Sequence, residues 1–426
     1  MVFTSFNFLV FFPTVLVVYF LLPQKFRWMF LLAASYYFYI NIKPVYALLL
    51  AGVTLTTYIF TNLIAQTNSE KGKRLYLTLA IVLTLLPLLF FKYFNFVNEG
   101  IYSLLNLAGL HLQLPQISLL LPVGISFYTF MALGYTIDVY NEEVEAEKNF
   151  GIVALFLSFF PVVMSGPIER ASNMFHQFRG KLQFSYEMAV SGLQLMLWGY
   201  FMKLALADRL SIYIDAVFKN VDQHVGSSLM LATLMQPIRV YGDLGGYSLI
   251  AIGCAKVMGI NVIPNFNRPF FATTMSEFWR RWHMSLIKWL TDYVYTPLSF
   301  AFRSYGKWGI VIALNLTFII SGAWHGAALN FLVWGFIQGV ALSVEMLTRK
   351  RKDAFEARFN LSKKWWYIMF GCVFTYLLFA FSLSFGGDAA TVPEVLKIME
   401  RIFTDSLRLP YKDGDTMLYG FIAFSI

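Results

Sequence analysis

Long apolar runs alternate with short polar connections along almost the whole chain. Most runs are close to the ~20 residues that an α-helix needs to cross a bilayer, so the pattern predicts an all-α, polytopic integral membrane protein. We expect about 10–12 transmembrane or re-entrant helices, because some runs are too short or too polar for a simple lipid-exposed crossing, especially 150–166 and 306–321. The apolar runs are 3–22, 28–42, 45–65, 76–94, 117–140, 150–166, 186–206, 228–260, 306–321, 324–347 and 365–386.

Both ends of the chain are apolar. Met1–Leu22 has no basic segment before it and no small-residue cleavage site, so we expect a first transmembrane helix and not a cleavable signal. Met417–Ile426 is too short to cross a bilayer, which indicates either a truncated end or a segment at the membrane interface. Because we find neither an internal repeat nor a soluble domain, we expect one membrane-embedded domain over 1–426.

Composition and charge support the membrane assignment. Charged residues make up 13% of the chain and hydrophobic residues 58%, whereas soluble proteins carry about 25% charged residues. The net charge of +9 does not indicate nucleic-acid binding, because its densest cluster, Arg349–Lys352, directly follows an apolar run. Basic residues at that place mark the cytoplasmic side and attract anionic lipid. The basic residues after the first and third runs would then place the N-terminus outside.

His325 is the first candidate for chemistry. It lies in Ser321-Gly-Ala-Trp-His-Gly-Ala-Ala328, within an apolar stretch from about Ile310 to Leu347. A titratable imidazole is costly in hydrocarbon, so we expect it to face a cavity, a pathway or a partner. The small residues beside it allow helices or a slender ligand to approach closely. A buried histidine with space beside it is a candidate general base.

A second informative segment runs from Thr274 to Asp292. Thr274 and Glu277 have the spacing of a capping box, which predicts that a helix starts here. One apolar face of that helix would be formed by Trp279, Trp282, Leu286, Trp289 and Tyr293, with Arg280, Arg281 and Lys288 among them. Such a helix often only anchors a protein at the membrane interface. His283 adds a second titratable group, so His283 and His325 form the best candidate catalytic pair.

Other polar residues give weaker signals. Asp243, Tyr247 and Ser248 lie among three glycines in an apolar run. The carboxylate there is expected either to be paired or to line a cavity, and the alternative is a structural aspartate at a helix break. The two cysteines, Cys254 and Cys372, have no metal-ligand spacing, so we expect no metal. No Walker, GxSxG, HExxH or dinucleotide motif suggests an ATP-driven or hydrolytic enzyme.

Several motifs occur together along nearly the whole chain. They are MVFTSFNF at 1–8, LPVGISFY at 121–128, IDVY at 137–140, FPVVMSGPIER at 160–170, EFWRRWH at 277–283 and WHG at 324–326. This set resembles the membrane-bound O-acyltransferase family, especially the branch with the membrane subunit of bacterial alginate O-acetylation. The resemblance implies a fold of two opposed funnels with interfacial helices. It assigns the family's essential histidine to His325 and its second signature histidine to His283.

The resemblance also implies an activity. An acyl group, usually acetyl, would pass from a cytoplasmic thioester donor to an extracytoplasmic polysaccharide or cell-envelope glycan, in the bacterial cytoplasmic membrane. The donor would be acetyl-CoA, another acyl-CoA or an acyl carrier protein, with no bound cofactor. A separate extracytoplasmic acetyltransferase is the expected partner. Besides the two histidines, the expected substrate contacts are Trp324, Asp243, Tyr247, Ser248, Trp279, Arg280, Arg281, Trp282 and Asn330.

Two departures leave the donor and the acceptor open. Relatives of the alginate type have a second aspartate at the end of the motif that here reads Gly242–Leu249, where Leu249 takes its place. Their Leu-Gly-Gly-Asn-Arg turn is replaced by Leu298–Arg303. Transfer of D-alanine from a carrier protein is therefore one alternative. A transporter or channel with a pathway lined by His and Asp is the other, although we find no duplicated halves, which transporters often have.

Overall fold

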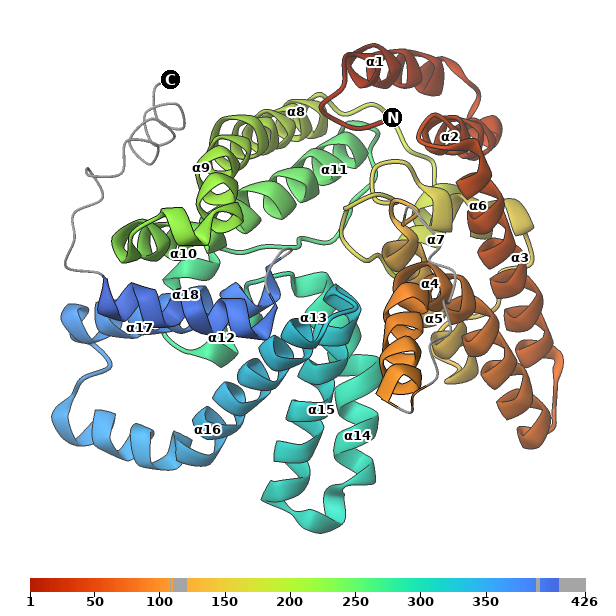
Figure 1. Ribbon diagram of the computed structural model, residues 1–426. Coiled ribbons are helices and arrows are strands. Elements are labelled where there is room, and N and C mark those ends of the chain that lie inside the picture. Colours follow the sequence, from red (N-terminus) through yellow and green to blue (C-terminus); the bar gives the residue numbers. More distant parts are fainter. Residues whose placement is uncertain (108, 110–120, 388–390, 406–426) are drawn as a thin grey trace. The chain divides into compact units, whose positions relative to one another are not determined.

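The computed structural model describes the chain except for residues 108, 110–120, 388–390 and 406–426 (Figure 1). The described part consists of helices and their connections, without a strand. Six of its helical stretches are long and apolar enough to cross a membrane, and α1 (Phe6–Leu21) is a shorter apolar helix. The all-α, polytopic membrane assignment is therefore confirmed. The run at 417–426 and the first residues of the 117–140 run lie outside the described residues.

The six stretches match predicted apolar runs, with longer bounds for several of them. They are Pro44–Gln66, Glu70–Leu107, Tyr186–Lys219, Lys307–His325, Leu329–Phe359 and Trp365–Gly386. The chain divides into two compact units, the first comprising Met1–Tyr200 and Tyr247–Pro264 and the second Phe201–Gly246 and Asn265–Ile426. The expectations of one domain and of opposed funnels stay predictions.

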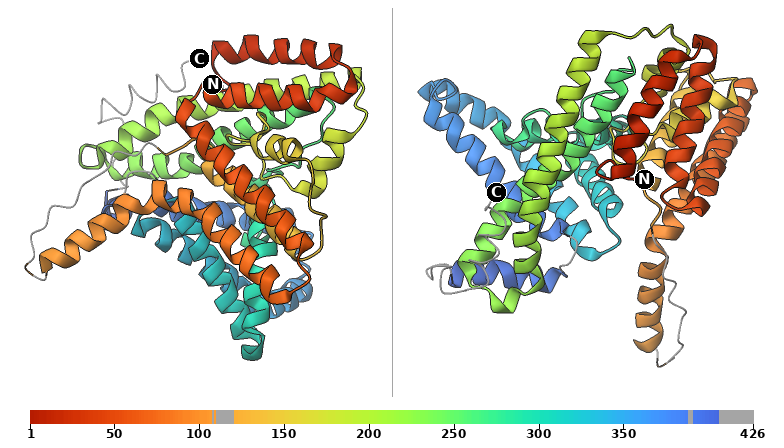
Figure 2. Two further views of the ribbon diagram at one scale, coloured as in Figure 1. Left: turned by 90° about the vertical axis from the view of Figure 1, so that its right-hand side faces the viewer. Right: turned by 90° about the horizontal axis from the view of Figure 1, so that it is seen from above.

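The first unit contains α1 and eight further helices. α1 and α2 lie side by side as an antiparallel pair (Figure 2). The run at 150–166 forms only a short helix followed by a turn, and Phe159 and Phe160 in that turn have no exposed surface. This run is buried, as its length suggested. The helices after α1 are α2 Gln24–Ile40, α3 Pro44–Gln66, α4 Glu70–Leu107, α5 Ile125–Tyr140, α6 Phe150–Ser158, α7 Ala171–Arg179, α8 Tyr186–Tyr200 and α11 Gly246–Val257.

The second unit contains both candidate histidines and all the expected substrate contacts except Tyr247 and Ser248. Its helices are α9 Asp208–Lys219, α10 Gly226–Val240, α12 Met275–Trp279, α13 Met284–Leu290, α14 Thr296–Ala301, α15 Lys307–His325, α16 Leu329–Phe359, α17 Trp365–Leu383 and α18 Val392–Thr404. Three π-helical turns, at Phe201–Ala207, Tyr241–Gly245 and Thr291–Tyr295, connect or extend them. The glycine-rich helix break expected near Asp243 is one of these π turns.

The helices α15 and α16 form a tight hairpin, and their boundary corrects one prediction. His325 is the last residue of α15 and does not lie within a second span starting at 324. Two glycines allow the close packing: a Cβ on Gly322 would lie 2.2 Å from the Phe331 carbonyl oxygen, and one on Gly335 would lie 2.2 Å from the Phe318 carbonyl oxygen. The small residues therefore bring two backbones into contact, which fixes the position of the hairpin end that carries His325.

The segment after Thr274 is not one amphipathic helix. The Thr274 hydroxyl accepts a hydrogen bond from the Glu277 amide at 3.2 Å, so the predicted start is confirmed. However, α12 ends at Trp279, and α13 begins only at Met284. The predicted aromatic face is packed inside the second unit, where Trp279 and Trp282 belong to a buried core cluster with Phe278, Phe318, Trp334 and Phe379. The single amphipathic helix predicted for this segment is therefore wrong, and its tryptophans are covered by neighbouring helices.

Candidate functional site

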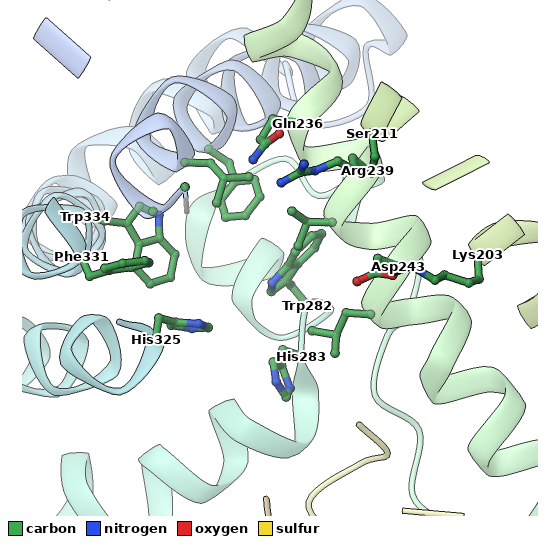
Figure 3. Close-up of a pocket in the computed structure, with 16 residues that line it drawn as sticks. Lys203, Ser211, Gln236, Arg239, Asp243, Trp282, His283, His325, Phe331 and Trp334 are labelled. Atoms are coloured by element: carbon green, nitrogen blue, oxygen red, sulfur yellow. Dashed lines mark hydrogen bonds and ion pairs between the residues drawn. The ribbon is translucent and has the colours of Figure 1, made fainter. Parts of the chain in front are cut away.

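A cavity of about 430 Å³ in the second unit contains both candidate histidines (Figure 3). Its volume falls within the range of about 300–1,000 Å³ that is typical of small-molecule sites. The wall comes from α9, α10, the π turn after α10, the link between α12 and α13, the α15–α16 hairpin and the end of α17. The lining residues are Lys203, Ser211, Gln236, Arg239, Val240, Asp243, Leu244, Trp282, His283, His325, Phe331, Trp334, Phe379, Leu383, Gly386 and Gly387.

His325 reaches this cavity from the end of α15. Its imidazole lies edge-on to the Trp334 ring, with ring centroids 5.1 Å apart and an interplanar angle of 88°. The Trp324 ring lies on another side, with centroids 4.8 Å apart. His325 is exposed and not buried as expected, because its helix ends at the cavity wall. Two indole rings therefore restrict the orientation of an imidazole that the cavity can reach.

His283 lines the same cavity from the link between α12 and α13, but it is buried. Its Nδ1 lies 3.1 Å from the Asn265 side-chain oxygen. That oxygen also accepts hydrogen bonds from the Ser285 amide at 3.3 Å and the Ser285 hydroxyl at 2.8 Å. An amide nitrogen can only donate, so the Asn265 atom is its carbonyl oxygen, and the His283 Nδ1 must carry the proton. In the neutral imidazole, Nε2 is then the basic nitrogen.

Trp324 connects the two histidines. Its ring centroid lies 6.3 Å from that of His283 and 4.8 Å from that of His325. The two imidazoles thus belong to one aromatic cluster at one cavity, although they are 42 positions apart in the sequence. Trp324 was among the expected substrate contacts, and its place is beside both rings and not among the residues that line the cavity.

Charged residues form the wall opposite the hairpin. Lys203 Nζ lies 2.5 Å from Asp243 Oδ1 and 2.7 Å from Asp208 Oδ1, and Arg239 Nη1 lies 2.7 Å from Asp215 Oδ1. Both cations therefore have acidic partners, and the wall has no excess positive charge. Sequence analysis did not single out Lys203 or Arg239. The signal for Lys203 was present, because a lysine within the 186–206 apolar run is as costly as His325.

Two buried polar atoms at the cavity lack a hydrogen-bond partner among the described residues. They are the Trp334 Nε1 and the Gln236 Oε1, and both residues line the cavity. A buried donor or acceptor without a partner costs about 1–3 kcal/mol, so such a group in a native structure needs a physical reason. Neither residue was predicted from the sequence, because a tryptophan or glutamine within an apolar helix has no distinctive spacing.

The other expected contacts lie away from the cavity. Arg280 is exposed, and Arg281 pairs with Glu277 at 2.6 Å. Trp279 is buried and donates from Nε1 to the Gln338 side-chain oxygen at 3.2 Å. These residues support the link that carries His283, but the structure does not place them on the cavity wall.

The last three expected contacts lie in different parts of the structure. Asn330 is buried, and its amide lies 3.5 Å from the carbonyl oxygen of Gly387, which lines the cavity. Tyr247 and Ser248 belong to the first unit, where the Tyr247 ring lies 5.9 Å from that of Phe3. Among the described residues, no three His, Cys or acidic side chains cluster.

His283 should make the stability of the protein depend on pH. Burial lowers the pKa of His283 from 6.5 to about 4. Between these values the unfolded chain binds a proton that the folded protein excludes, so stability falls as the pH drops from 6.5 through 4. The full effect is about 3 kcal/mol, at 1.36 kcal/mol per unit. Thermal unfolding of wild type should therefore show a clear loss of Tm between about pH 7 and about pH 4.5.

The variant His283→Gln should lose much of this pH dependence, because glutamine does not titrate. His176→Gln is the matched control, since His176 is exposed. An equal drop in Tm for wild type and His283→Gln would show that His283 does not titrate as described.

Comparisons with known proteins identify the family of the chain. Residues 34–384 match the family model described as MBOAT, membrane-bound O-acyltransferase family. The probable alginate O-acetylase AlgI of Pseudomonas aeruginosa is 34% identical over 351 residues, covering 81% of this chain and 66% of that protein. The peptidoglycan O-acetyltransferase of Helicobacter pylori is 32% identical over 346 residues, covering 74% of this chain and 63% of that protein.

A third relative is named for the transfer of D-alanyl and not of acetyl groups. The teichoic acid D-alanyltransferase of Streptococcus thermophilus is 30% identical over 302 residues, covering 67% of this chain and 68% of that protein. The matches to these three relatives thus extend over 63% to 68% of their own lengths. The family match extends over most of this chain and includes both cavity histidines, so the chain belongs to the membrane-bound O-acyltransferase family.

Proposed function

We propose that the protein is a membrane O-acyltransferase that moves an acetyl or related acyl group from a cytoplasmic thioester across the membrane, for O-acylation of an extracytoplasmic glycan. The observation that carries the proposal is the placement of His325 and His283 on one cavity within the family-matched region. The protein would lie in the bacterial cytoplasmic membrane with its N-terminus outside. A separate extracytoplasmic acetyltransferase would complete the modification of the polymer.

His325 would act as the general base. Its imidazole takes the proton of the acceptor hydroxyl while the hydroxyl oxygen attacks the carbonyl carbon of the thioester. The carbon–sulfur bond then breaks, and the departing thiolate receives the proton back from His325. General base catalysis of this kind is typically worth about 10²–10⁴-fold in rate. The access of His325 to the cavity and its restricted orientation between two indole rings support this role.

Trp334 and His283 would assist in different ways. The Trp334 N–H lacks a partner in the described part of the chain and belongs to the ring that contacts His325. We assign it as the donor to the carbonyl oxygen, where negative charge develops during attack. His283, with its proton on Nδ1, would accept a hydrogen bond at Nε2 from an amide or hydroxyl of the bound donor and so orient it.

The cavity would take the thioester end of the donor and not its phosphates. Both cations on its wall are paired with carboxylates, so the wall offers no surplus of positive charge for phosphate groups. Acyl-CoA and acyl carrier protein carry the thioester on the same slender arm. Either donor could therefore present its acyl group here while its charged part remains outside.

The test is acyl transfer by purified protein in defined lipid. Radiolabelled acetyl-CoA, an acetyl carrier protein and a D-alanyl carrier protein are supplied in turn, with a glycan acceptor and the expected partner present. Thiol release together with labelled glycan is the expected result, and the donor that gives it identifies the acyl group. A folded protein that releases no thiol from any donor, but passes labelled substrate across the membrane, would overturn the enzyme in favour of a transporter.

A further inference from the structure

A second cavity of about 650 Å³ in the second unit shares no lining residue with the histidine cavity. Its wall comes chiefly from α16 and α17, which are joined by a short loop (Figure 1). Both helices belong to stretches that are long and apolar enough to cross a membrane. This cavity, here called the α16–α17 groove, therefore lies along membrane-spanning helices.

One end of the α16–α17 groove is almost entirely apolar. Several of its side chains have half or more of their surface exposed, for example Val344 with 54% and Phe374 with 57%. From Tyr367 to Leu378 the α17 wall rises roughly 16 Å at 1.5 Å per residue, which is about half of a 30 Å hydrocarbon core. The apolar wall residues are Phe336, Ile337, Val340, Ala341, Val344, Ile368, Phe370, Phe374 and Leu378.

The other end of the groove, near the loop, is polar and carries one cation and one carboxylate. It is lined by Thr348, Lys352, Glu356, Ser362 and Tyr367. Lys352 lies 3.6 Å from Glu356, which also accepts a hydrogen bond from the Tyr367 hydroxyl at 2.9 Å. Lys352 is the last residue of the Arg349–Lys352 cluster, whose first three residues are exposed. Three further cations, Arg349, Lys350 and Arg351, thus precede Lys352 on the same helix, and Arg349 lies 3.8 Å from Asp353.

We propose that the α16–α17 groove is a binding site for an anionic phospholipid. One acyl chain lies along the apolar wall, and the headgroup meets the hydroxyls of Thr348, Ser362 and Tyr367. Lys352 is paired with Glu356 and Arg349 with Asp353, so the surplus charge that attracts the phosphate is that of the whole Arg349–Lys352 cluster, four cations against two carboxylates. Along the groove, an apolar wall about half a bilayer long is followed by a polar end beside the basic Arg349–Lys352 cluster. The acyl chain and the anionic headgroup of such a lipid follow one another in the same order. Each basic residue near the membrane surface adds about 1 kcal/mol of attraction for anionic lipid.

The bound lipid would also support the segment that leads to His283. Thr273, Thr274 and Met275 line the inner part of the groove, and they form the start of α12. Glu345, another lining residue, accepts a hydrogen bond from the Ser276 amide at 3.1 Å. An acyl chain in the groove would therefore stabilise the beginning of the short helix whose far end carries the link to His283.

The first experiment measures lipid retention when a bulky side chain occupies the groove. Protein is reconstituted in equal parts of phosphatidylglycerol and phosphatidylethanolamine, and the retained lipid is identified by native mass spectrometry. Val344→Trp adds bulk to the apolar wall and should abolish retention of phosphatidylglycerol. Val373→Trp is the matched control, since Val373 is 50% exposed on α17 but does not line the groove. Equal retention by Val344→Trp and wild type would overturn the site.

A second wall variant keeps the test decisive if Val344→Trp does not fold. Phe374→Ala removes contact area without adding bulk, so it should weaken retention and lower the thermal stability that added phosphatidylglycerol confers. Retention of detergent or of an apolar peptide in the groove, with no lipid, would also overturn the proposal.

The headgroup is tested separately. Lys352→Gln should lower the preference for phosphatidylglycerol over phosphatidylethanolamine about fivefold, which corresponds to the loss of one basic residue. Lys71→Gln is the control, because Lys71 is an exposed lysine on α4. An unchanged preference in Lys352→Gln would overturn the assignment of the anionic headgroup. Both measurements follow lipid binding alone, so they stand whatever the transferred acyl group proves to be.

Discussion

Replacement of His325 by glutamine is expected to lower the rate of acyl transfer by about 10²–10⁴-fold. Glutamine keeps a polar side chain between the rings of Trp324 and Trp334, but it cannot take the proton of the acceptor hydroxyl. Because His325 is exposed at the end of its helix, the exchange should leave the Tm close to that of wild type. The measurement is kcat with saturating donor and acceptor, together with a thermal unfolding curve.

A chemical rescue distinguishes a base from a positioning group. His325→Ala leaves space beside the cavity, so added imidazole should restore part of the lost activity in proportion to its unprotonated fraction. His176→Gln, at an exposed position on α7, controls for the loss of a histidine as such. Wild-type turnover by a well-folded His325→Gln would show that another group takes the proton.

Replacement of Trp334 by phenylalanine is expected to reduce kcat by about 10²-fold, the lower end of the effect of removing one oxyanion donor. Phenylalanine keeps an aromatic ring against His325 and removes only the indole N–H. That N–H is buried and has no partner among the described residues. Its removal should therefore leave the Tm unchanged or raise it. The measurement is kcat, KM and Tm for the same preparation.

Trp279→Phe provides the contrast. The Trp279 N–H donates to Gln338, so its loss leaves an acceptor unpaired in the core, and the Tm should fall. The loss of kcat should be smaller than in Trp334→Phe, because Trp279 does not line the cavity. If Trp334→Phe loses stability and keeps its kcat, the Trp334 N–H is a structural group and not a donor to substrate.

The helical membrane fold could be predicted well from the sequence, because an apolar run of bilayer length is rarely anything but a membrane-spanning helix. The sequence could not show how the tryptophan segment bends. The spacing of Trp279, Trp282 and Trp289 is the same whether one helix continues or two helices meet at a tight turn. An anchor at the membrane surface stayed open as an alternative for these aromatic side chains, because hydrophobic spacing shows which residues share a face but not what covers that face.

The candidate site was predictable only where a side chain was chemically out of place. A histidine in an apolar run is costly, so His325 and His283 drew attention, and the structure places both on one cavity. Lys203 satisfied the same criterion but was overlooked, since a single lysine also occurs near helix ends. Trp334 and Gln236 could not be identified, because their importance depends on partners that they lack, and only three-dimensional packing reveals this.

The backbone at His283 has a consequence for how this position changes during evolution. His283 has φ 44° and ψ 50°, in the left-handed region, which costs a residue with a side chain about 1–2 kcal/mol. Glycine and asparagine tolerate that conformation best, so selection on backbone conformation alone would replace the histidine by one of them. Only a requirement for the imidazole opposes this drift. In a relative with the same turn, a glycine or asparagine here would therefore mark a protein released from that requirement.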